Sequence, residues 1–472
     1  MLSFTSLTPS LIEELIQQFG TAFIKYDAET INNFSHDWTE DFHFPPAAVV
    51  FPTSTQEVSQ IVKWCNENNI PITPAGACTG LSGGMLPVFG GIVLSTLRLN
   101  KILEIDTRNL QARVQPGVIN EELQQAAAAL GLYYPPDPSS KGSCTIGGNL
   151  AHNAGGIHAV KYGVTREYVL SLEAVMADGN IIRTGANVLK NSTGYSLTHL
   201  LIGSEGTLAV ITEATLKLIP LPKYRLVLVA SFPQAALACE AVSAIFSAGI
   251  TPSALEFMER DAIVFGYQFL KLSDKIPDDV QAQLLIEIDG NYPDILQQEA
   301  QQIGEVLEKF QVSDILFADT PSAQNEVFKV RRCLGEAVKG TTIYKEEDTV
   351  VPRAELPRLL NKVKEIGKIY GFQSVCYGHA GDGNLHVNII KTPELSQEQW
   401  EILIPKAIRE IFQFTLALKG TLSGEHGIGY VQQPYLDIAF SEVEINLFKN
   451  IKKLWDPKGI LNPGKMGNAL KF

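Results

Sequence analysis

Residues 74–84 read Pro-Ala-Gly-Ala-Cys-Thr-Gly-Leu-Ser-Gly-Gly, a run in which four of eleven positions are glycine. Glycine lets backbone N–H groups come close to a phosphate and form a concave anion-binding surface. The hydroxyls of Thr79 and Ser82 add two further donors. Taken alone, the run fits an ordinary surface loop equally well, so its interpretation depends on the rest of the chain.

Two more glycine-rich segments follow, at 141–156 and at 203–208. Three such loops in one domain indicate one large, extended ligand. A nicotinamide Rossmann unit is disfavoured because no GxGxxG motif follows a strand pattern. Residues 459–465 resemble a phosphate-binding P-loop, but Met466 stands where Ser or Thr would hold magnesium, and no strand precedes it.

The periodicity of apolar residues predicts an α+β fold with hairpins and βαβ-like pieces rather than a regular alternation. Helices are predicted at 8–19, 54–68, 119–130, 233–247, 293–310, 397–418 and 441–455. Strands are predicted at 48–51, 70–74, 91–95, 102–106, 111–115, 170–177, 181–184, 226–232 and 284–289. The proline- and glycine-rich stretch 135–156 is predicted to be a loop. The chain, at 472 residues, is too long for one core and should form two or three domains.

Three of the eight histidines lie in two short patches near the C-terminus, residues 378–386 and 423–427. Asp382-Gly383 is a favoured two-residue hairpin turn, which would place His379 directly opposite His386. Directly opposed residues have Cβ atoms about 4.5–5.5 Å apart. Both imidazoles could then bind one metal ion.

Glu425 would complete a site of two histidines and one carboxylate, a set that suits zinc, manganese or iron. His426, with an ordinary pKa near neutrality, could act as a general base. Asn388 lies two residues beyond His386, so on the same face of the predicted strand. Each patch alone fits structural polar residues better. Their coincidence with a system of loops large enough for a cofactor favours a metal site.

Composition restricts the possible functions. The formal net charge is −13 and no basic stripe occurs, so a nucleic-acid role is disfavoured and an anionic substrate would need a local positive centre such as a metal or an arginine. The six cysteines form no CxxC pair, which predicts reduced, packed thiols and no iron–sulfur cluster. No signal peptide or membrane-spanning run is recognised, so a cytoplasmic location is expected, with peripheral membrane association left open.

Several segments match one family in order and spacing: residues 74–84, 134–138, 143–156, 203–208, 378–386, 424–427 and 460–465. Together they resemble the FAD-dependent D-2-hydroxy acid dehydrogenases. That family includes the flavin subunit of glycolate oxidase, D-lactate dehydrogenase and D-2-hydroxyglutarate dehydrogenase, and it shares the flavin fold of vanillyl-alcohol oxidase. The resemblance implies an FAD-binding domain of the PCMH type at 1–220 and a substrate-binding cap with the metal hairpin at 221–395. A helical segment at 396–472 would complete the active site and return to the FAD domain.

The resemblance also implies roles for individual residues. The FAD pyrophosphate would be bound by Gly76, Ala77, Cys78, Thr79, Gly80, Leu81 and Ser82. The flavin would be lined by Pro138, Ser143, Cys144, Thr145, Gly148, Asn149, Asn153 and Gly155. Glu205 and Ile211 would lie near the adenine, and Asn462 belongs to the cofactor site. His379, His386 and Glu425 would bind a divalent metal, with zinc as the first candidate and manganese or iron as alternatives. His426 would take the hydroxyl proton, and Arg331 and Asn388 would contact the substrate.

Some positions depart from the family pattern. Ala75 and Cys78 stand where family members usually have Arg and Gly. Glu346 and Gly335 stand where the 2-hydroxyglutarate branch has a lysine and a threonine, which favours D-lactate or glycolate as substrate. Neither His158 nor Cys78 matches a covalent flavin attachment, so non-covalent FAD is expected.

Other interpretations stay open. They are a D-2-hydroxyglutarate dehydrogenase, a metal-independent sugar or alcohol oxidase of the same fold, and a non-catalytic subunit of a flavin complex. The sequence does not choose the electron acceptor among a quinone, a cytochrome, an electron-transfer flavoprotein and oxygen. It also leaves open a homodimer or partner subunits.

Overall fold

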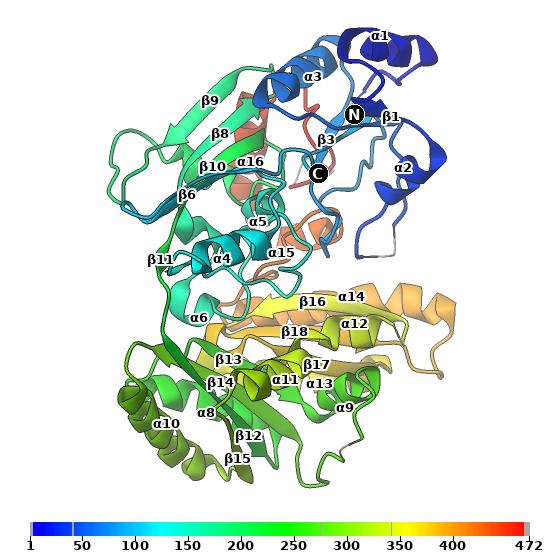
Figure 1. Ribbon diagram of the computed structural model, residues 1–472. Coiled ribbons are helices and arrows are strands. Elements are labelled where there is room, and N and C mark those ends of the chain that lie inside the picture. Colours follow the sequence, from blue (N-terminus) through cyan, green and yellow to red (C-terminus); the bar gives the residue numbers. More distant parts are fainter. Residues whose placement is uncertain (1–2, 40–41, 274, 341, 467–472) are drawn as a thin grey trace. The chain divides into compact units, whose positions relative to one another are not determined.

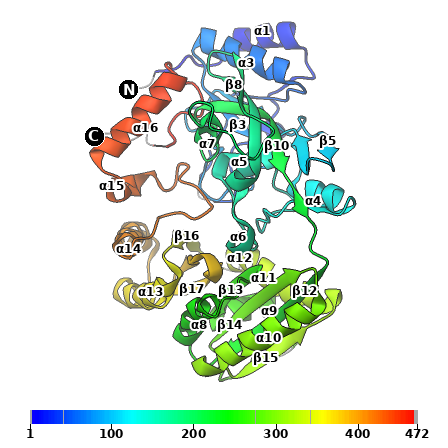
Figure 2. The same ribbon diagram turned by 90° about the vertical axis from the view of Figure 1, so that its left-hand side faces the viewer.

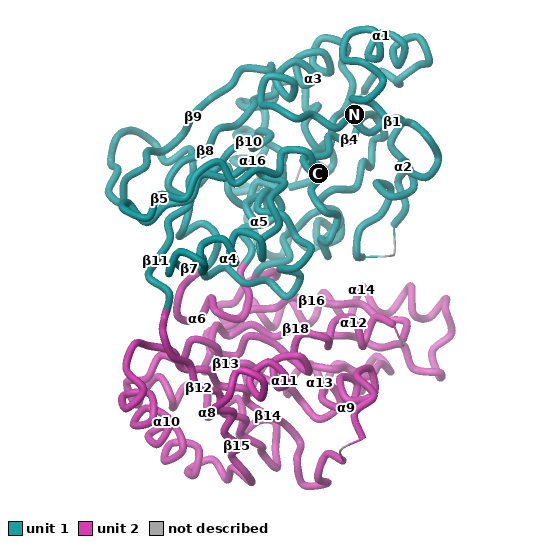
Figure 3. Tube along the Cα trace, viewed as in Figure 1, with its two compact units in different colours: residues 1–154, 164–221, 425–472 teal, residues 155–163, 222–424 magenta. Residues whose placement is uncertain are grey.

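The computed structural model describes residues 3–39, 42–273, 275–340 and 342–466. The chain forms two compact units (Figure 3). Unit 1 consists of Met1–Ala154, Val164–Leu221 and Glu425–Phe472, and unit 2 of Gly155–Gly163 and Pro222–Gly424. Within the described ranges, no helix combines the length and the apolar character needed to cross a membrane.

Unit 1 contains a four-stranded sheet in the order β1-β2-β4-β3, in which β2 and β3 both run parallel to β4 (Figure 1). Its strands are β1 (Ile24–Lys25), β2 (Ala48–Val50), β3 (Ile72–Ala75) and β4 (Ile92–Ser95), and the helices around it are α1 (Pro9–Phe19), α2 (Ala28–Asn33) and α3 (Thr55–Asn68). Ser54 caps α3 by accepting a hydrogen bond from the Glu57 N–H at 3.2 Å. The apolar face of α3 is buried in the core, as its sequence period predicts.

A second, antiparallel sheet of unit 1 has the order β5-β6-β10-β8-β9. Its strands are β5 (Ile102–Asp106), β6 (Gln111–Val114), β8 (Val169–Met176), β9 (Ile181–Gly185) and β10 (Ala209–Lys217). The small pair β7 (Leu132–Tyr133) and β11 (Ile219–Pro220) accompanies it. The remaining helices of unit 1 are α4 (Asn120–Ala128), α5 (Ile146–His152), α7 (Leu197–Leu201), α15 (Leu436–Ala439) and α16 (Glu442–Trp455), with the 3₁₀ segments η1 (Thr165–Tyr168) and η5 (Gln433–Tyr435).

The loop prediction for 135–156 is wrong in its second half, where α5 forms. Thr145 caps this helix by accepting a hydrogen bond from the Gly148 N–H at 3.3 Å. Gly147 packs so closely on Pro116 that a Cβ at this position would lie 2.6 Å from the Pro116 Cβ. Two adjacent glycines weaken the local helix signal because glycine has low helix propensity. Tertiary packing selects the helix here.

Unit 2 is built on a seven-stranded antiparallel sheet in the order β15-β12-β14-β13-β17-β18-β16. Its strands are β12 (Tyr224–Phe232), β13 (Ala254–Glu259), β14 (Ala282–Gly290), β15 (Asp314–Ala318), β16 (Tyr344–Val350), β17 (Gln373–Gly378) and β18 (Asn384–Ile390). Its helices are α6 (Ala159–Tyr162), α8 (Ala235–Ser247), α9 (Arg260–Phe269), α10 (Pro293–Leu307), α11 (Pro321–Arg332), α12 (Leu334–Lys339), α13 (Leu356–Tyr370) and α14 (Gln397–Ala417), with the 3₁₀ segments η2 (Glu308–Phe310), η3 (Arg353–Glu355) and η4 (Ala380–Asp382).

Helices cover the sheet of unit 2. Helix α8 contacts β12, β13 and β14, and α13 contacts β17 and lies beside α14 (Figure 2). Helices α9 and α12 share a core cluster with Met258 of β13 and Tyr377 of β17. The sheet face that carries these two side chains also carries the polar groups described below.

The predicted hairpin exists, but its predicted register is wrong. Tyr377, not His379, pairs with His386. The five residues 379–383 connect the strands through η4, and Gly383 adopts the left-handed conformation at φ +78°. The Val351 N–H donates to the Gly383 carbonyl at 3.0 Å, which holds this connection against the strand next to it. A local turn preference could not reveal that longer-range contact.

Candidate active site

A row of buried polar side chains crosses one face of the unit 2 sheet. Directly paired residues of antiparallel strands share a face. His386 of β18 pairs with Asp348 on one side and Tyr377 on the other. Asn388 pairs in the same way with Glu346, and the Asn388 side chain is fully buried. The strand period therefore places His386 and Asn388 together, as the sequence predicts.

The two hairpin histidines lie side by side despite the corrected register. The ring centroids of His379 and His386 are 5.3 Å apart and the ring planes are nearly perpendicular at 82°. Each residue is 4% exposed. His379 Nδ1 lies 2.8 Å from Oε1 and 2.9 Å from Oε2 of Glu256, a residue of β13. That both imidazoles bind one ion stays a prediction, and the proximity of the two rings is compatible with it.

Glu256 also contacts Arg331, which lies in the last turn of α11. The Arg331 Nε is 2.7 Å from Glu256 Oε2, and both side chains are almost completely buried. Within the described ranges, Arg331 Nη2 has no hydrogen-bond partner. Burial by itself would raise the pKa of the Glu256 carboxyl, but its contacts with His379 and Arg331 hold that pKa below its ordinary value.

Sequence reasoning missed Glu256. The local signal is that two carboxylates, Glu256 and Glu259, lie in the strand Ala254–Glu259, whose other residues are apolar; this is unusual because a buried charge needs a partner. The partners, His379 and Arg331, are far away in the sequence. Their identity could not be read from the strand itself.

Asp348 fixes the end of unit 2 that precedes Glu425. Its Oδ2 accepts hydrogen bonds from the Gly424 N–H at 2.8 Å and from Ser423 Oγ at 3.1 Å. Its Oδ1 accepts from Asn384 Nδ2 at 2.7 Å. Gly424 is required here, because a Cβ would lie 2.6 Å from Val350 Cγ2. Glu425 and then His426 follow Gly424 directly in the chain.

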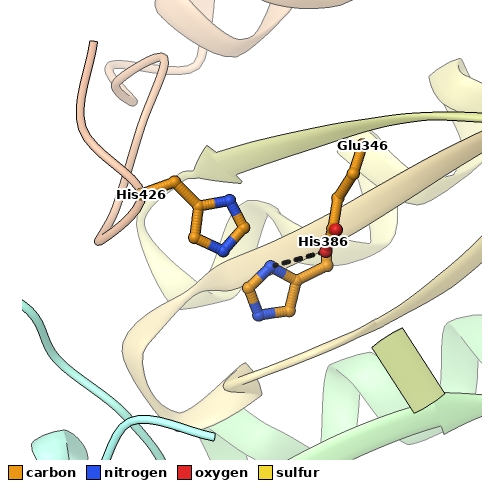
Figure 4. A group of neighbouring side chains, drawn as sticks. All are labelled: Glu346, His386 and His426. Atoms are coloured by element: carbon orange, nitrogen blue, oxygen red, sulfur yellow. Dashed lines mark ion pairs between the residues drawn. The ribbon is translucent and has the colours of Figure 1, made fainter. Parts of the chain in front are cut away.

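Two groups of side chains have the composition and spacing of metal ligands. His379, His386 and Glu425 offer ligand atoms within 4.8 Å of one another, and so do Glu346, His386 and His426. In the second group, Glu346 Oε1 lies 3.9 Å from His386 Nδ1 (Figure 4). Two imidazoles with one carboxylate form the donor set of catalytic zinc, manganese or iron sites that keep open positions. The residues present therefore fit a divalent metal.

The far end of this face is also polar. Asn388 Nδ2 donates to the Val375 carbonyl at 3.4 Å. Burial, together with the nearby Glu346, raises the pKa of the Tyr377 phenol well above its ordinary value, so it stays protonated. Gly335 packs next to the Tyr377 hydroxyl, which an added Cβ would approach to 3.8 Å. A carboxylate and a neutral phenol thus flank this end of the face.

Unit 1 contains a separate pocket of about 630 Å³, part of it open to solvent. It is lined by the residues Pro74, Ala75, Gly76, Gly84, Met85, Thr96, Pro116, Gly147, Gly148, Ala151, His152, Leu201, Ser204, Glu205, Gly206, Ala209, Val210 and Ile211. All three glycine-rich segments of the sequence contribute to this wall.

Four of the residues predicted to bind the cofactor line this pocket: Gly76, Gly148, Glu205 and Ile211. The other residues predicted to bind the cofactor do not line the pocket: Ala77, Cys78, Thr79, Gly80, Leu81, Ser82, Pro138, Ser143, Cys144, Thr145, Asn149, Asn153, Gly155 and Asn462. Most of them continue the same loops or belong to α5. Gly155 is the first residue of the chain in unit 2. Cys78 adopts a left-handed φ of +59°, a conformation that glycine would adopt with less strain.

Glu205 and Asn462 are engaged with the protein itself. The Glu205 carboxylate accepts hydrogen bonds from the N–H groups of Ile428 at 2.7 Å and Gly429 at 2.8 Å. Asn462 Nδ2 donates to the carbonyls of Gly84 at 2.8 Å and Glu205 at 2.7 Å. These bonds tie the segment after His426 and the C-terminal segment to the pocket wall, a function that the sequence did not suggest.

Comparison with known proteins agrees with this combination of a glycine-lined pocket and a polar sheet face. Residues 221–466 match the family described as FAD linked oxidases, C-terminal domain, and residues 46–185 match an FAD binding domain. The chain belongs to the FAD-linked oxidase family. Its fold is the two-domain FAD-binding fold of the PCMH and vanillyl-alcohol oxidase type, so the predicted family and the predicted α+β fold class are confirmed.

Full-length relatives of this FAD-linked oxidase are similar across nearly the whole chain. Glycolate oxidase subunit GlcD of Bacillus subtilis is 39% identical, with 98% of this chain and 97% of that protein covered. A D-lactate dehydrogenase of Anaerostipes hadrus is 37% identical, with 98% of both chains covered. D-2-hydroxyglutarate dehydrogenase of Stutzerimonas stutzeri is 33% identical, with 97% of this chain and 99% of that protein covered. The solved structure of p-cresol methylhydroxylase shares the fold at a TM-score of 0.78 and 17% identity, with 98% of this chain and 99% of that chain covered.

Proposed function

We propose that this FAD-linked oxidoreductase oxidises a short D-2-hydroxy acid, D-lactate or glycolate, to the 2-oxo acid. The observation that carries the proposal is the group His379, His386 and Glu425, whose ligand atoms lie within 4.8 Å of one another, together with the buried Arg331, which Glu256 links to His379. A 2-hydroxy acid has adjacent carboxylate and hydroxyl oxygens, which suit a metal with open positions. Its negative charge suits the arginine.

Arg331 would bind the substrate carboxylate. Arg331 is 2% exposed, and its Nη2 has no hydrogen-bond partner within the part of the chain that the structure describes. A buried donor without a partner is costly, which supports a ligand that supplies the missing acceptor. Asn388, on the same sheet face as His386, would contact the substrate beside the metal ligands.

His379, His386 and Glu425 would hold a divalent metal, with zinc as the first candidate and manganese or iron as alternatives. When bound, the metal would supply a positive centre that lowers the pKa of the substrate hydroxyl. His426 would take the proton from that hydroxyl as the C2 hydride leaves, so that the C–O single bond becomes the carbonyl. When bound, non-covalent FAD would accept the hydride.

Glu346 supports a substrate with one carboxylate. Its side chain lies 3.9 Å from His386 Nδ1, so a second carboxylate of a longer substrate would meet a negative charge at this end of the face. The same position is a lysine in the 2-hydroxyglutarate branch of the family. This difference favours D-lactate or glycolate over D-2-hydroxyglutarate.

The test is the visible spectrum of the purified protein under anaerobic conditions, before and after addition of D-lactate, glycolate or D-2-hydroxyglutarate. We expect D-lactate or glycolate to bleach the flavin of the wild type. We expect His426→Ala to retain the FAD spectrum and lose rapid bleaching. A variant that is reduced at the wild-type rate would refute the role of His426. A wild type reduced only by D-2-hydroxyglutarate would refute the substrate assignment, and reduction by a sugar without metal would refute the reaction class.

A further inference from the structure

One buried carboxylate joins the two parts of the proposed substrate site. Glu256 is fully buried on the central strand β13, where it is flanked by the core residues Leu255 and Phe257. Its two oxygens face His379 Nδ1, and Oε2 also faces Arg331 Nε. A charge at such a position is expensive unless it is paired. Here the two partners are a proposed metal ligand and the proposed substrate-binding arginine.

We propose that Glu256 is a positioning residue, which sets the tautomer of His379 and the orientation of the Arg331 guanidinium. This inference rests on the function proposed above and adds a residue to it. Glu256 would act only through these two side chains and would touch neither the substrate nor the cofactor. Its carboxylate would thereby link metal binding to recognition of the substrate carboxylate.

The contact with His379 determines which ring nitrogen carries the proton. A neutral imidazole has one N–H and one lone pair, whereas a carboxylate can only accept hydrogen bonds. With Nδ1 at 2.8 and 2.9 Å from the two oxygens, the proton belongs on Nδ1. The lone pair of Nε2 is then the one that can ligand an ion. A carboxylate behind a metal-binding histidine commonly has this effect and also makes the ring a stronger ligand.

The contact with Arg331 fixes the direction of a planar fork. Nε is held 2.7 Å from Glu256 Oε2, and the guanidinium carbon lies 5.0 Å from the centre of the Tyr377 ring. The Nε edge of the guanidinium therefore contacts Glu256 and is not available to a ligand. Because the group is planar, the direction of Nη2 follows from that contact. Glu256 therefore presents the unpaired Nη2 in one orientation.

A purely structural ion pair is the competing explanation, and the same strand provides a matched control. Glu259, three residues along β13, is also buried, at 5% exposure. Its Oε1 accepts hydrogen bonds from Lys364 Nζ at 2.7 Å and from the Cys376 N–H at 2.6 Å. An odd spacing on a strand places Glu259 on the opposite face from Glu256. Loss of its charge should affect stability but not the metal site.

The experiment compares Glu256→Gln with Glu259→Gln in the full-length FAD-bound protein. Glutamine keeps the size of the side chain but replaces one acceptor oxygen with a donor NH2 group. Because both oxygens of Glu256 face His379 Nδ1, the amide must point its NH2 at that nitrogen or rotate away. The first outcome favours the tautomer with the proton on Nε2, so that Nε2 cannot ligand an ion. The second removes the acceptor that holds the proton on Nδ1.

We expect Glu256→Gln to keep the flavin spectrum but to lower zinc affinity about 10–100-fold, measured by competition with a chromophoric chelator. The dissociation constant of D-lactate in anaerobic flavin reduction should rise as well. Glu259→Gln should lower the melting temperature and leave zinc affinity within about twofold of the wild type, since it lacks contact with the site. Wild-type zinc affinity in Glu256→Gln, or equal losses in both variants, would overturn the inference.

A second measurement needs no substitution at Glu256. Long-range ¹⁵N–¹H spectra of histidine-labelled wild-type protein report which ring nitrogen is protonated, and the His379 signal is identified by its absence in His379→Ala. A proton on Nδ1 is expected, and a proton on Nε2 would overturn the inference. A wild type that binds no divalent metal would instead overturn the proposed function, and this inference with it, so the two failures are distinguishable.

Discussion

Substitution of Arg331 separates its proposed binding function from its structural one. In Arg331→Lys, a single ammonium can still pair with the buried Glu256 but offers no planar fork to the substrate. In Arg331→Met, Glu256 keeps His379 as a partner and loses the guanidinium 2.7 Å from its Oε2. Both variants therefore remove the proposed contact with the substrate. They differ beside Glu256, where the lysine variant leaves a positive charge and the methionine variant leaves none.

The magnitudes follow from these contacts. A hydrogen bond to a charged group contributes about 1.5–3 kcal/mol, so loss of the Nη2 contact should weaken substrate binding about 10–150-fold in both variants. Removing one partner of a buried ion pair costs about 3–5 kcal/mol. Arg331→Met should therefore also lower the melting temperature by on the order of 10 °C, whereas Arg331→Lys should stay near the wild type.

The assay is stopped-flow anaerobic reduction of the flavin over a range of D-lactate concentrations, together with a thermal melt of each variant. Arg332→Met, the next residue on α11 and only partly buried, is the control and should change neither quantity appreciably. Wild-type substrate binding in Arg331→Lys would refute the role of Arg331 in recognition. Equal melting temperatures of Arg331→Met and the wild type would refute the energetic argument about Glu256.

Three further predictions concern specificity, backbone conformation and pH. Glu346→Lys should raise the ratio of D-2-hydroxyglutarate to D-lactate turnover at least about tenfold, because it replaces a repulsive charge with an attractive one, and an unchanged ratio would contradict this. Gly383→Ala should lower the melting temperature more than Gly371→Ala: both glycines have positive φ, at +78° and +80°, but a Cβ at 383 would also collide with the Val351 carbonyl. Equal decreases in melting temperature in the two variants would contradict the expected collision at position 383. Burial lowers the pKa of Lys465 from 10.5 to about 8. Between these two pH values the unfolded chain binds a proton that the folded chain lacks. The free energy of unfolding should therefore rise by roughly 3 kcal/mol as the pH increases from 8 to 10.5. Chemical unfolding at both pH values should show this rise in the wild type but not in Lys465→Met.

Local sequence was sufficient for much of the fold and for the types of residue in the candidate site. The helices at 9–19 and 55–68 begin where Thr8 and Ser54 cap them, because a capping oxygen and an apolar period act within a few residues. The glycine-rich segments were recognised from composition, and they line one pocket. The pairing of Asp348 with His386 could not be recognised from local sequence. It depends on β16 and β18, which are far apart in the sequence and become neighbours only in the folded sheet.

The register of the hairpin formed by β17 and β18 shows the limit of local reasoning. Asp382-Gly383 is a favoured two-residue turn, but the structure uses a five-residue connection. The decisive contact is the hydrogen bond from the Val351 N–H to the Gly383 carbonyl, made by a segment more than thirty residues earlier in the chain. Turn propensity is a small energy, and tertiary contacts override it.

By itself, the sequence determined that this protein has a glycine-lined cofactor pocket and a pair of histidines with a nearby carboxylate, because these features lie in short contiguous segments. Only the tertiary structure decided that Glu256 stands behind His379, 123 residues away, and beside Arg331. The physical reason is that a buried charge must find opposite charges and donors wherever the fold brings them. That choice depends on the pairing of distant strands, which no local pattern encodes.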